Sequence, residues 1–226
     1  MGTLTLTEFT TYIKFNFGNN DAWSTPTDYY TIWFNRAYNR LTTQDMLLGV
    51  KRRFYFPQLE TSANADTVDG VAYIGVPADC LVIRDLYDTE NYRRLASITP
   101  RTYLSYTDRA DTTAEGEPTE WVRQAAYLYL HPTPDDAYTI NVHYRQIPAA
   151  LSSGASTTAI GAEWDDVLIT LASYIGKMWT MDYEKAKMLK EEFKEQAEGI
   201  ISLYGEEAKA REEFLHVDEV YRDRGY

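Results

Sequence analysis

The pattern of apolar positions changes period twice along the chain. Up to about residue 52, apolar residues recur every three to four positions, as in Phe9, Ile13 and Phe17, which is typical of amphipathic helices. Between residues 53 and 161 the apolar runs are short, rich in β-branched and aromatic residues and bounded by turn residues, which predicts strands. The helical period then returns from Trp164 to Tyr204. Helices are therefore predicted at both ends of a β-rich middle.

The first helical region is divided by turn and capping signals. Gly18–Asp21 ends the first segment, and Ser24–Thr27 supplies a capping hydroxyl together with a proline for the start of the next helix. A further helix is predicted to restart at Thr42 and to continue to Phe54.

The β-rich region has its clearest signal between Tyr138 and Tyr144. Apolar and polar residues alternate there, which predicts a half-buried antiparallel strand. The turn His131–Asp136, which contains two prolines, joins this strand to the apolar run that ends at Leu130. The polar stretch of residues 107–118 is predicted to be a long loop.

The last helical region is predicted to be two antiparallel helices. The first runs from Trp164 to Met178, and the second runs from Ala186 to Tyr204. A bend is expected between them at residues 181–183, with Asp182 as a candidate cap.

These elements predict an α+β fold in three parts. Residues 1–52 and 162–205 form an antiparallel helical bundle, residues 53–161 form an inserted antiparallel β-sheet domain that is sandwich-like, and residues 206–226 form a C-terminal arm. Because a helix this short and polar is marginal in water, the arm is either a frayed tail or a segment that orders on a partner. Its few apolar residues are Phe214, Leu215, Val217, Val220 and Tyr221.

Composition narrows the class of protein. The chain holds 19 Tyr, 8 Phe and 5 Trp, and such rings bury their bodies while keeping a polar edge, which suits both cores and protein interfaces. The net charge is −12 and no segment forms a basic stripe, which argues against binding to phosphate backbones. The same acidic excess would let DNA pass nearby without sticking.

Cysteine usage and hydropathy add two expectations about compartment. Cys80 is the only cysteine, so no internal disulfide can form, and its apolar neighbours predict that it is buried. No apolar run approaches the ~20 residues that a membrane span requires, and the N-terminus lacks the basic-then-apolar order of a signal peptide. An intracellular origin and no membrane partner are expected.

No set of residues has the spacing of a reactive site. His131, His143 and His216 stand on three different predicted elements, and no pair of them has metal-ligand spacing. The chain contains no Gly-x-Ser-x-Gly elbow and no Gly-rich phosphate loop. The adjacent carboxylates Asp135–Asp136 and Asp165–Asp166 are interpreted as a turn and as the first turn of a helix, where the dipole favours negative charge. We therefore predict no catalytic, cofactor or metal site, and a protein that is not an enzyme.

Six stretches of the chain, in their order and spacing, resemble the bacteriophage head-to-tail adaptor family, the connector proteins that sit beneath the portal. The likeness runs from roughly residue 53 to residue 204 and includes proline–acid turns, an aromatic strand and the start of a long helix. The stretches are Val76–Asp79, Leu95–Tyr103, Glu115–Trp121, Leu130–Asp135, Tyr144–Leu151 and Trp164–Leu168.

The resemblance implies a structural virion protein at the head–tail junction, made in the cytoplasm of the bacterial host. Members of such a family assemble into a ring of about twelve subunits, dock on the portal protein and offer the other face to tail or tail-terminator proteins. Genomic DNA would pass through the ring without specific binding, and no cofactor is implied. The role of the portal-binding arm would fall to the apolar residues of the C-terminal segment: Phe214, Leu215, Val217, Val220 and Tyr221.

Two other classes of function remain open from the residues alone. One is a ligand-recognition module in which the aromatic-rich β insert binds carbohydrate or peptide. The other is a hydrolase whose site has no recognised motif.

Overall fold

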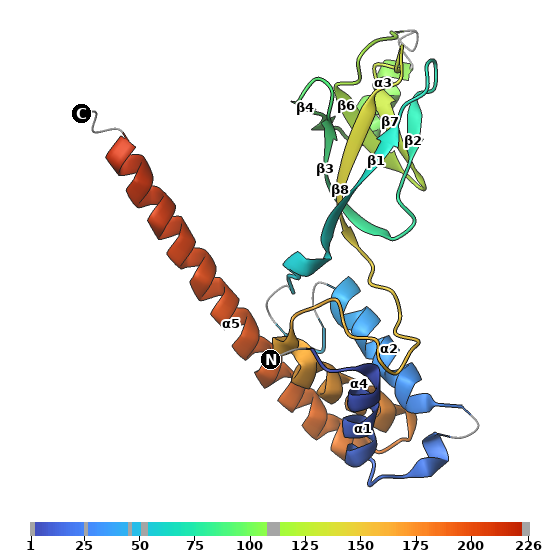
Figure 1. The fold of residues 1–226 in the computed structure, drawn as a ribbon, viewed down its shortest axis with the longest axis vertical. Helices are drawn as coiled ribbons and strands as arrows, with labels where there is room; N and C mark the ends of the chain where they lie inside the picture. The colour runs from blue at the N-terminus through green and yellow to red at the C-terminus, as the bar shows by residue number, and fades with distance from the viewer. Residues whose placement is uncertain (1–2, 25–26, 45–46, 51–53, 108–113, 223–226) are drawn as a thin grey trace. The chain divides into compact units, whose positions relative to one another are not determined.

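The structure is a computed structural model that describes residues 3–24, 27–44, 47–50, 54–107 and 114–222. Side chains are described for these residues except at position 107 and at positions 204–222. The chain divides into two compact units, Met1–Phe56 with Ala149–Tyr226, and Pro57–Pro148 (Figure 1). The first unit is helical and the second is built on two mostly antiparallel sheets, so the predicted α+β class is confirmed.

The first unit is built from helices, and capping residues fix where the first two of them begin. Thr5 and Glu8 form a reciprocal capping box at the first helix, and the Asp28 carboxylate accepts the backbone N–H groups of Tyr30 and Thr31 at the second. The helices are α1 (Leu6–Asn16), α2 (Tyr29–Thr43), α4 (Asp165–Trp179) and α5 (Tyr183–Arg222), with 3₁₀ turns η1 (Asp21–Trp23) and η4 (Ala162–Trp164).

Helix α4 is the central element of the first unit. It packs against α1, α2 and α5, and ten of its fifteen residues are buried, from Asp165 at its start to Lys177 near its end. At Gly176 two aromatic rings approach the helix so closely that a Cβ atom would lie 2.6 Å from Trp33 and 2.7 Å from Phe17. Glycine is therefore required by the packing of the rings and not by the helix itself.

Buried tyrosines tie loops to the helical core through their hydroxyl groups. The Tyr30 hydroxyl donates to the Asn20 carbonyl at 2.7 Å, and the Tyr38 hydroxyl accepts the Ala159 N–H at 2.7 Å. Burial raises the pKa of both phenols. Part of the high tyrosine content is thus explained by rings that fill the core and whose edges satisfy loop backbone groups.

The segment of residues 149–161 belongs to the helical unit, whereas the sequence assigned it to the β-rich insert. Its backbone accepts two hydrogen bonds from the start of α1, Leu6 N–H to Ser156 at 2.8 Å and Thr7 N–H to Gly154 at 3.1 Å. The Asn35 side chain of α2 also bonds both backbone groups of Leu151. These hydrogen bonds place the chain crossing between the units near residue 148.

The second unit contains two four-stranded sheets. The first has the strand order β1-β8-β3-β4 and the second β2-β7-β6-β5, with β5 and β6 as the parallel pair. The bounds are β1 (Glu60–Asp66), β2 (Tyr73–Gly75), β3 (Cys80–Asp88), β4 (Arg93–Arg94), β5 (Ala96–Ser97), β6 (Glu120–Gln124), β7 (Tyr127–His131) and β8 (Thr139–Gln146), with helix α3 (Pro100–Thr107) and the 3₁₀ turn η2 (Pro57–Leu59).

One buried apolar cluster joins side chains of both sheets. The predicted alternation in β8 is confirmed, because Ile140, Val142 and Tyr144 are buried in this cluster while His143 is exposed. Cys80 is buried in the same cluster, and burial raises the pKa of its thiol. Each sheet thus has one face on a shared core.

Three local predictions differ from the structure. The helix predicted from Thr42 to Phe54 is wrong over its described part, since α2 ends at Thr43 and residues 48 and 49 turn the chain with φ values of 52° and 90°. The start of the predicted loop of residues 107–118 is preceded by helix α3, which the sequence did not predict, and residues 108–113 lie outside the described part. Helix α5 does not end near Gly205 but continues to Arg222.

Two glycine substitutions test the role of packing around α4. We expect Gly176→Ala to lower the free energy of unfolding by about 1–3 kcal/mol, because the added methyl overpacks two rigid rings. Gly199→Ala, in an open position of α5 with no atom within 4 Å of the new methyl, should raise it by about 0.5–1 kcal/mol through helix propensity. Urea unfolding of both variants measures the difference, and equal stabilities would contradict the assigned packing.

Candidate interaction surfaces

Helix α5 is longer than the helix on which it packs. Ala186, Phe193 and Ala197 are buried and recur at helical spacing, with Leu189 and Ile200 half-buried on the same side. With 40 and 15 residues, α5 and α4 are about 60 Å and about 22 Å long. Because α5 is one continuous helix and is longer than α4, its C-terminal part extends past the end of α4 (Figure 1).

The residues predicted to form a portal-binding arm are on this C-terminal part. Its backbone is helical, but the side chains of Phe214, Leu215, Val217, Val220 and Tyr221 lie outside the described ones, as does that of His216. Their contacts stay a prediction.

A second surface lies at the corner between α4 and α5. Four large apolar side chains are exposed there: Met178, Trp179, Met181 and Tyr183. The corner is held by Lys177, whose ammonium lies 3.4 Å from the Asp182 carboxylate and 4.1 Å from the centre of the Phe17 ring. The predicted cap residue Asp182 also accepts the Lys185 N–H at 3.4 Å. These contacts hold an exposed apolar patch in a defined position, which is typical of an interface.

A third surface is a row of tyrosines on the sheet that contains β2 and β7. Tyr73 and Tyr127 are each nearly half exposed, and their ring centres are 4.9 Å apart. Tyr129 lies 5.7 Å from Tyr73 and 5.6 Å from Tyr103 of α3, so the four rings are contiguous. Gly75 leaves open space beside Tyr127, with which it is paired. We name Tyr73, Tyr103, Tyr127 and Tyr129 the tyrosine row.

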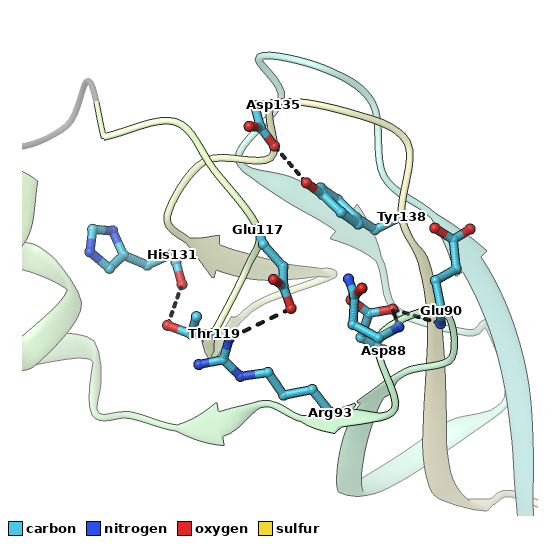
Figure 2. A network of polar contacts seen from close by, with 9 residues as sticks. Asp88, Glu90, Arg93, Glu117, Thr119, His131, Asp135 and Tyr138 are labelled. Atoms are coloured by element: carbon cyan, nitrogen blue, oxygen red, sulfur yellow. Dashed lines mark hydrogen bonds and ion pairs between the residues drawn. The ribbon is translucent and has the colours of Figure 1, made fainter.

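A fourth surface is a polar network at the loops that end several strands (Figure 2). Backbone hydrogen bonds connect these loops, for example Gly70 N–H to Pro134 and Gly116 N–H to Thr133, both at 2.9 Å. Asp88 is fully buried, and its carboxylate accepts the N–H groups of Glu90 and Asn91. The loops are therefore a built structure and not a set of loose connections.

The same network is strongly acidic. Arg93 pairs with Glu117 at 3.5 Å, but six further carboxylates are exposed on these loops and strand ends: Asp66, Asp69, Glu90, Glu115, Asp135 and Asp136. The Tyr138 hydroxyl donates to Asp135 at 2.7 Å, and this bond, followed by desolvation and the carboxylates nearby, raises the pKa of Tyr138 to about 12. Within the described residues this end of the second unit carries an excess of negative charge.

The two histidines whose side chains the structure describes, His131 and His143, do not converge on one site. The His131 ring stacks on Tyr106 with 4.3 Å between ring centres and points away from the polar network in Figure 2. His143 lies on the exposed face of β8. In the described part of the chain no group of three or more His, Cys, Asp or Glu side chains is arranged to hold a metal ion.

The sheet does bring a serine, a histidine and an aspartate into one row, which the sequence could not reveal. His143 is the register partner of Ser62 on one side and of Asp85 on the other. A hydrolytic triad requires hydrogen bonds from serine to histidine and from histidine to aspartate, and the described contacts include neither. Asp85 is instead bonded by the Arg94 guanidinium at 2.7 Å, so this row has the residue types of a triad without its geometry.

The paired carboxylates of α4 have a structural role. Asp165 is buried and its Oδ2 accepts the Leu4 N–H at 2.9 Å, which fixes the segment before α1. Burial raises the pKa of Asp165 against the opposing effect of that hydrogen bond, while Asp166 is exposed. One buried acceptor and one exposed carboxylate do not make an acid–base pair acting on a common substrate.

No described helix combines the length and the apolar character that crossing a membrane would need. Among curated proteins, none matches the chain. The model of one protein family, described as SU10 adaptor protein, matches residues 4–213. Since this match spans nearly the whole chain and includes helices and sheets of both units, the chain belongs to the SU10 adaptor protein family, a family of phage head-to-tail adaptors.

Proposed function

We propose that the chain is a structural part of the virion at the head–tail junction. Copies would form a ring of about twelve subunits under the portal, bind a tail or tail-terminator protein on the other side and line the channel for genomic DNA. In this proposal the first unit is an antiparallel helical bundle and the two sheets of the second unit pack as a sandwich. Family membership supports the adaptor role, the length of α5 supports the arm, and the negative charge supports the channel.

The observation that carries the proposal is the length of α5. Its first turns are buried against α4, while roughly the last twenty residues extend past any possible cover from that helix. The apolar residues Phe214, Val217 and Tyr221 are spaced three and four apart, so they share one face of a helix. The family match ends at residue 213, so the assignment of these residues to the portal contact rests on this proposal.

Charge supports the channel function. The chain carries a net charge of −12, and the exposed carboxylates of the polar network concentrate part of it at one place without a matching set of bases. A lumen with such a surface would repel DNA phosphates and so would not hold the genome during ejection.

Deleting residues 206–226 tests the arm. We expect the shortened protein to melt at the same temperature as the full chain, because α4, with fifteen residues, can cover only about the first fifteen residues of α5, and to lose binding to the portal protein of the same phage. A control that lacks only residues 223–226 retains the whole of α5 and should bind normally. Both are measured by sedimentation with purified portal, and full binding by the shortened protein would refute the arm.

Native mass spectrometry of the purified protein, alone and with portal, tests the ring. We expect one large species of about twelve copies, because closed rings of identical subunits satisfy all equivalent contacts. Trp179→Asp should weaken that species by charging the exposed patch at the α4–α5 corner. A monomer under both conditions would exclude the ring.

The tyrosine row favours a second candidate function, recognition of a carbohydrate by the second unit. Aromatic rings exposed side by side can stack on sugar rings, and Tyr73 and Tyr127 are the two most exposed members of the row. A glycan array probed with the full chain would show binding that Tyr73→Ala and Tyr127→Ala each reduce about tenfold, an estimate based on the loss of one ring contact. Tyr92→Ala is the matched control, since Tyr92 is 80% exposed and outside the row. No glycan binding, or equal loss in the control, would exclude this candidate.

A further inference from the structure

Strand β1 (Glu60–Asp66) is the longest outer strand of the second unit. It lies at one end of the order β1-β8-β3-β4 and has seven residues, whereas the other outer strands, β2, β4 and β5, have three, two and two. Outer strands leave backbone donors and acceptors open to pairing with another chain. The length of β1 makes it the main open edge among the described strands.

The register identifies the backbone groups on this edge. Thr67 N–H donates to the Tyr138 carbonyl at 2.9 Å, so residue 67 faces β8. Because the direction alternates along an antiparallel strand, the N–H and C=O groups of Ser62, Asn64 and Asp66 face away from β8. No described residue outside the sheet bonds these backbone groups.

The edge of β1 lacks most of the features that commonly protect an edge, and its two charged residues, Glu60 and Asp66, stand at its ends. It contains no proline and no lysine, and its register with β8 is unbroken from Glu60 to Asp66. The opposite side of the same sheet is covered within the chain: β3 has two register irregularities, the Leu81 carbonyl accepts from Arg123, and the Leu86 carbonyl accepts the Leu95 N–H. Only the β1 side is left available.

The side chains next to the edge define what would fit there. Ala63 and Ala65 face the apolar cluster but are only half-buried, while their register partners Val142 and Ile140 are fully buried. An added strand would lie about 4.8 Å from β1, and its inward residues would cover these two methyl groups. Apolar residues at alternate positions are therefore required.

Charge further restricts the partner. The Glu60 carboxylate is paired with Arg84 at 2.8 Å, whereas no described base lies within ion-pair distance of Asp66, and Asp69 is also exposed nearby. Antiparallel pairing of all seven residues of β1 with β1 of a second copy would place Glu60 opposite Asp66 twice, and like charges in directly opposed positions are destabilising. The edge favours a partner strand with a basic residue beside Asp66.

We propose that β1 is a docking edge to which a second protein adds an extended segment, with alternating apolar residues over Ala63 and Ala65 and a lysine or arginine beside Asp66. The added strand would pair through the backbone groups of Ser62, Asn64 and Asp66, which is the mode of β-strand addition. This proposal depends on the geometry of one strand and is independent of the ring and of the arm.

The test uses the full chain and a synthetic peptide, acetyl-Thr-Lys-Val-Thr-Val-Lys-Thr-amide, in which the valines lie opposite Ala63 and Ala65 and the first lysine lies opposite Asp66 on the same face. The control is a scrambled peptide of the same composition that lacks the alternation. Amide hydrogen exchange is followed by NMR at saturating peptide. We expect the amides of Ser62, Asn64 and Asp66 to exchange at least about tenfold more slowly, while those of Ala63 and Ala65, which already bond β8, change little. Slowing by both peptides alike, or at none of the three amides, would overturn the proposal.

Two variants separate edge pairing from other binding. Asn64→Pro removes an outward N–H without removing a bond to β8 and should abolish the protection, whereas Asn64→Ala retains the N–H and should preserve it. Asp66→Lys, which leaves the backbone intact, should weaken binding of the lysine peptide by about threefold and strengthen binding of a glutamate version. Equal binding by the two Asn64 variants would overturn the proposal. So would amides already protected in the free chain in a concentration-dependent way, because a second copy would then occupy the edge.

Discussion

The close packing of α4 with aromatic rings is the constraint on which the first unit depends. A single fifteen-residue helix is the common neighbour of α1, α2 and α5. At Gly176 the rings of Trp33 and Phe17 approach so closely that no side chain fits, and Lys177 continues this packing through the Phe17 ring and Asp182. Because α4 has only fifteen residues, it sets the length of α5 that it can cover. The length of α5 that remains uncovered follows from the size of its neighbour.

This dependence explains how a polar segment can be helical. An isolated helix with the composition of residues 206–226 would be marginal, since nucleation is costly and few apolar side chains are available. In α5 the nucleus is provided by the part packed on α4, so each additional residue needs only propagation. The sequence signal near Gly205 is a change in composition, and the helical backbone continues through it to Arg222.

The elements that could be predicted from the sequence are those with a strong apolar period. The helix from Trp164, the bend at Asp182 and the alternation of β8 were predictable because burial on one face repeats at 3.6 or 2 residues. Strand β1 was not, since its residues Glu-Thr-Ser-Ala-Asn-Ala-Asp include no large apolar side chain. Helix α3 was missed for a related reason: the helix has only eight residues, and most of them are polar, so it has no clear apolar period.

The candidate surfaces of the second unit could not be predicted from the sequence, because they depend on strand register and on elements without an apolar period. The tyrosine row depends on β2, β7 and the unpredicted α3, so the alternation of Tyr127 and Tyr129 alone could not show that four rings would be contiguous. The row of Ser62, His143 and Asp85 likewise exists only through strand register. By contrast, the family could be recognised from ordered turns and strands, because a resemblance depends on spacing along the chain and not on which side chains meet.

The two units leave different kinds of groups unsatisfied, and this difference bears on assembly. In the proposals above, the helical unit offers the side of a helix to apolar area of a partner, whereas the β unit offers backbone donors and acceptors of β1, which an added strand can pair in place of water. The polar network of the second unit, by comparison, satisfies its own loops through Asp88 and backbone bonds. If these proposals hold, the specificity of the protein for its neighbours lies in regular secondary structure, at the end of α5 and the edge of β1. Such contacts can be formed without reorganising the subunit, because the helix and the strand already have the conformation in which they would bind.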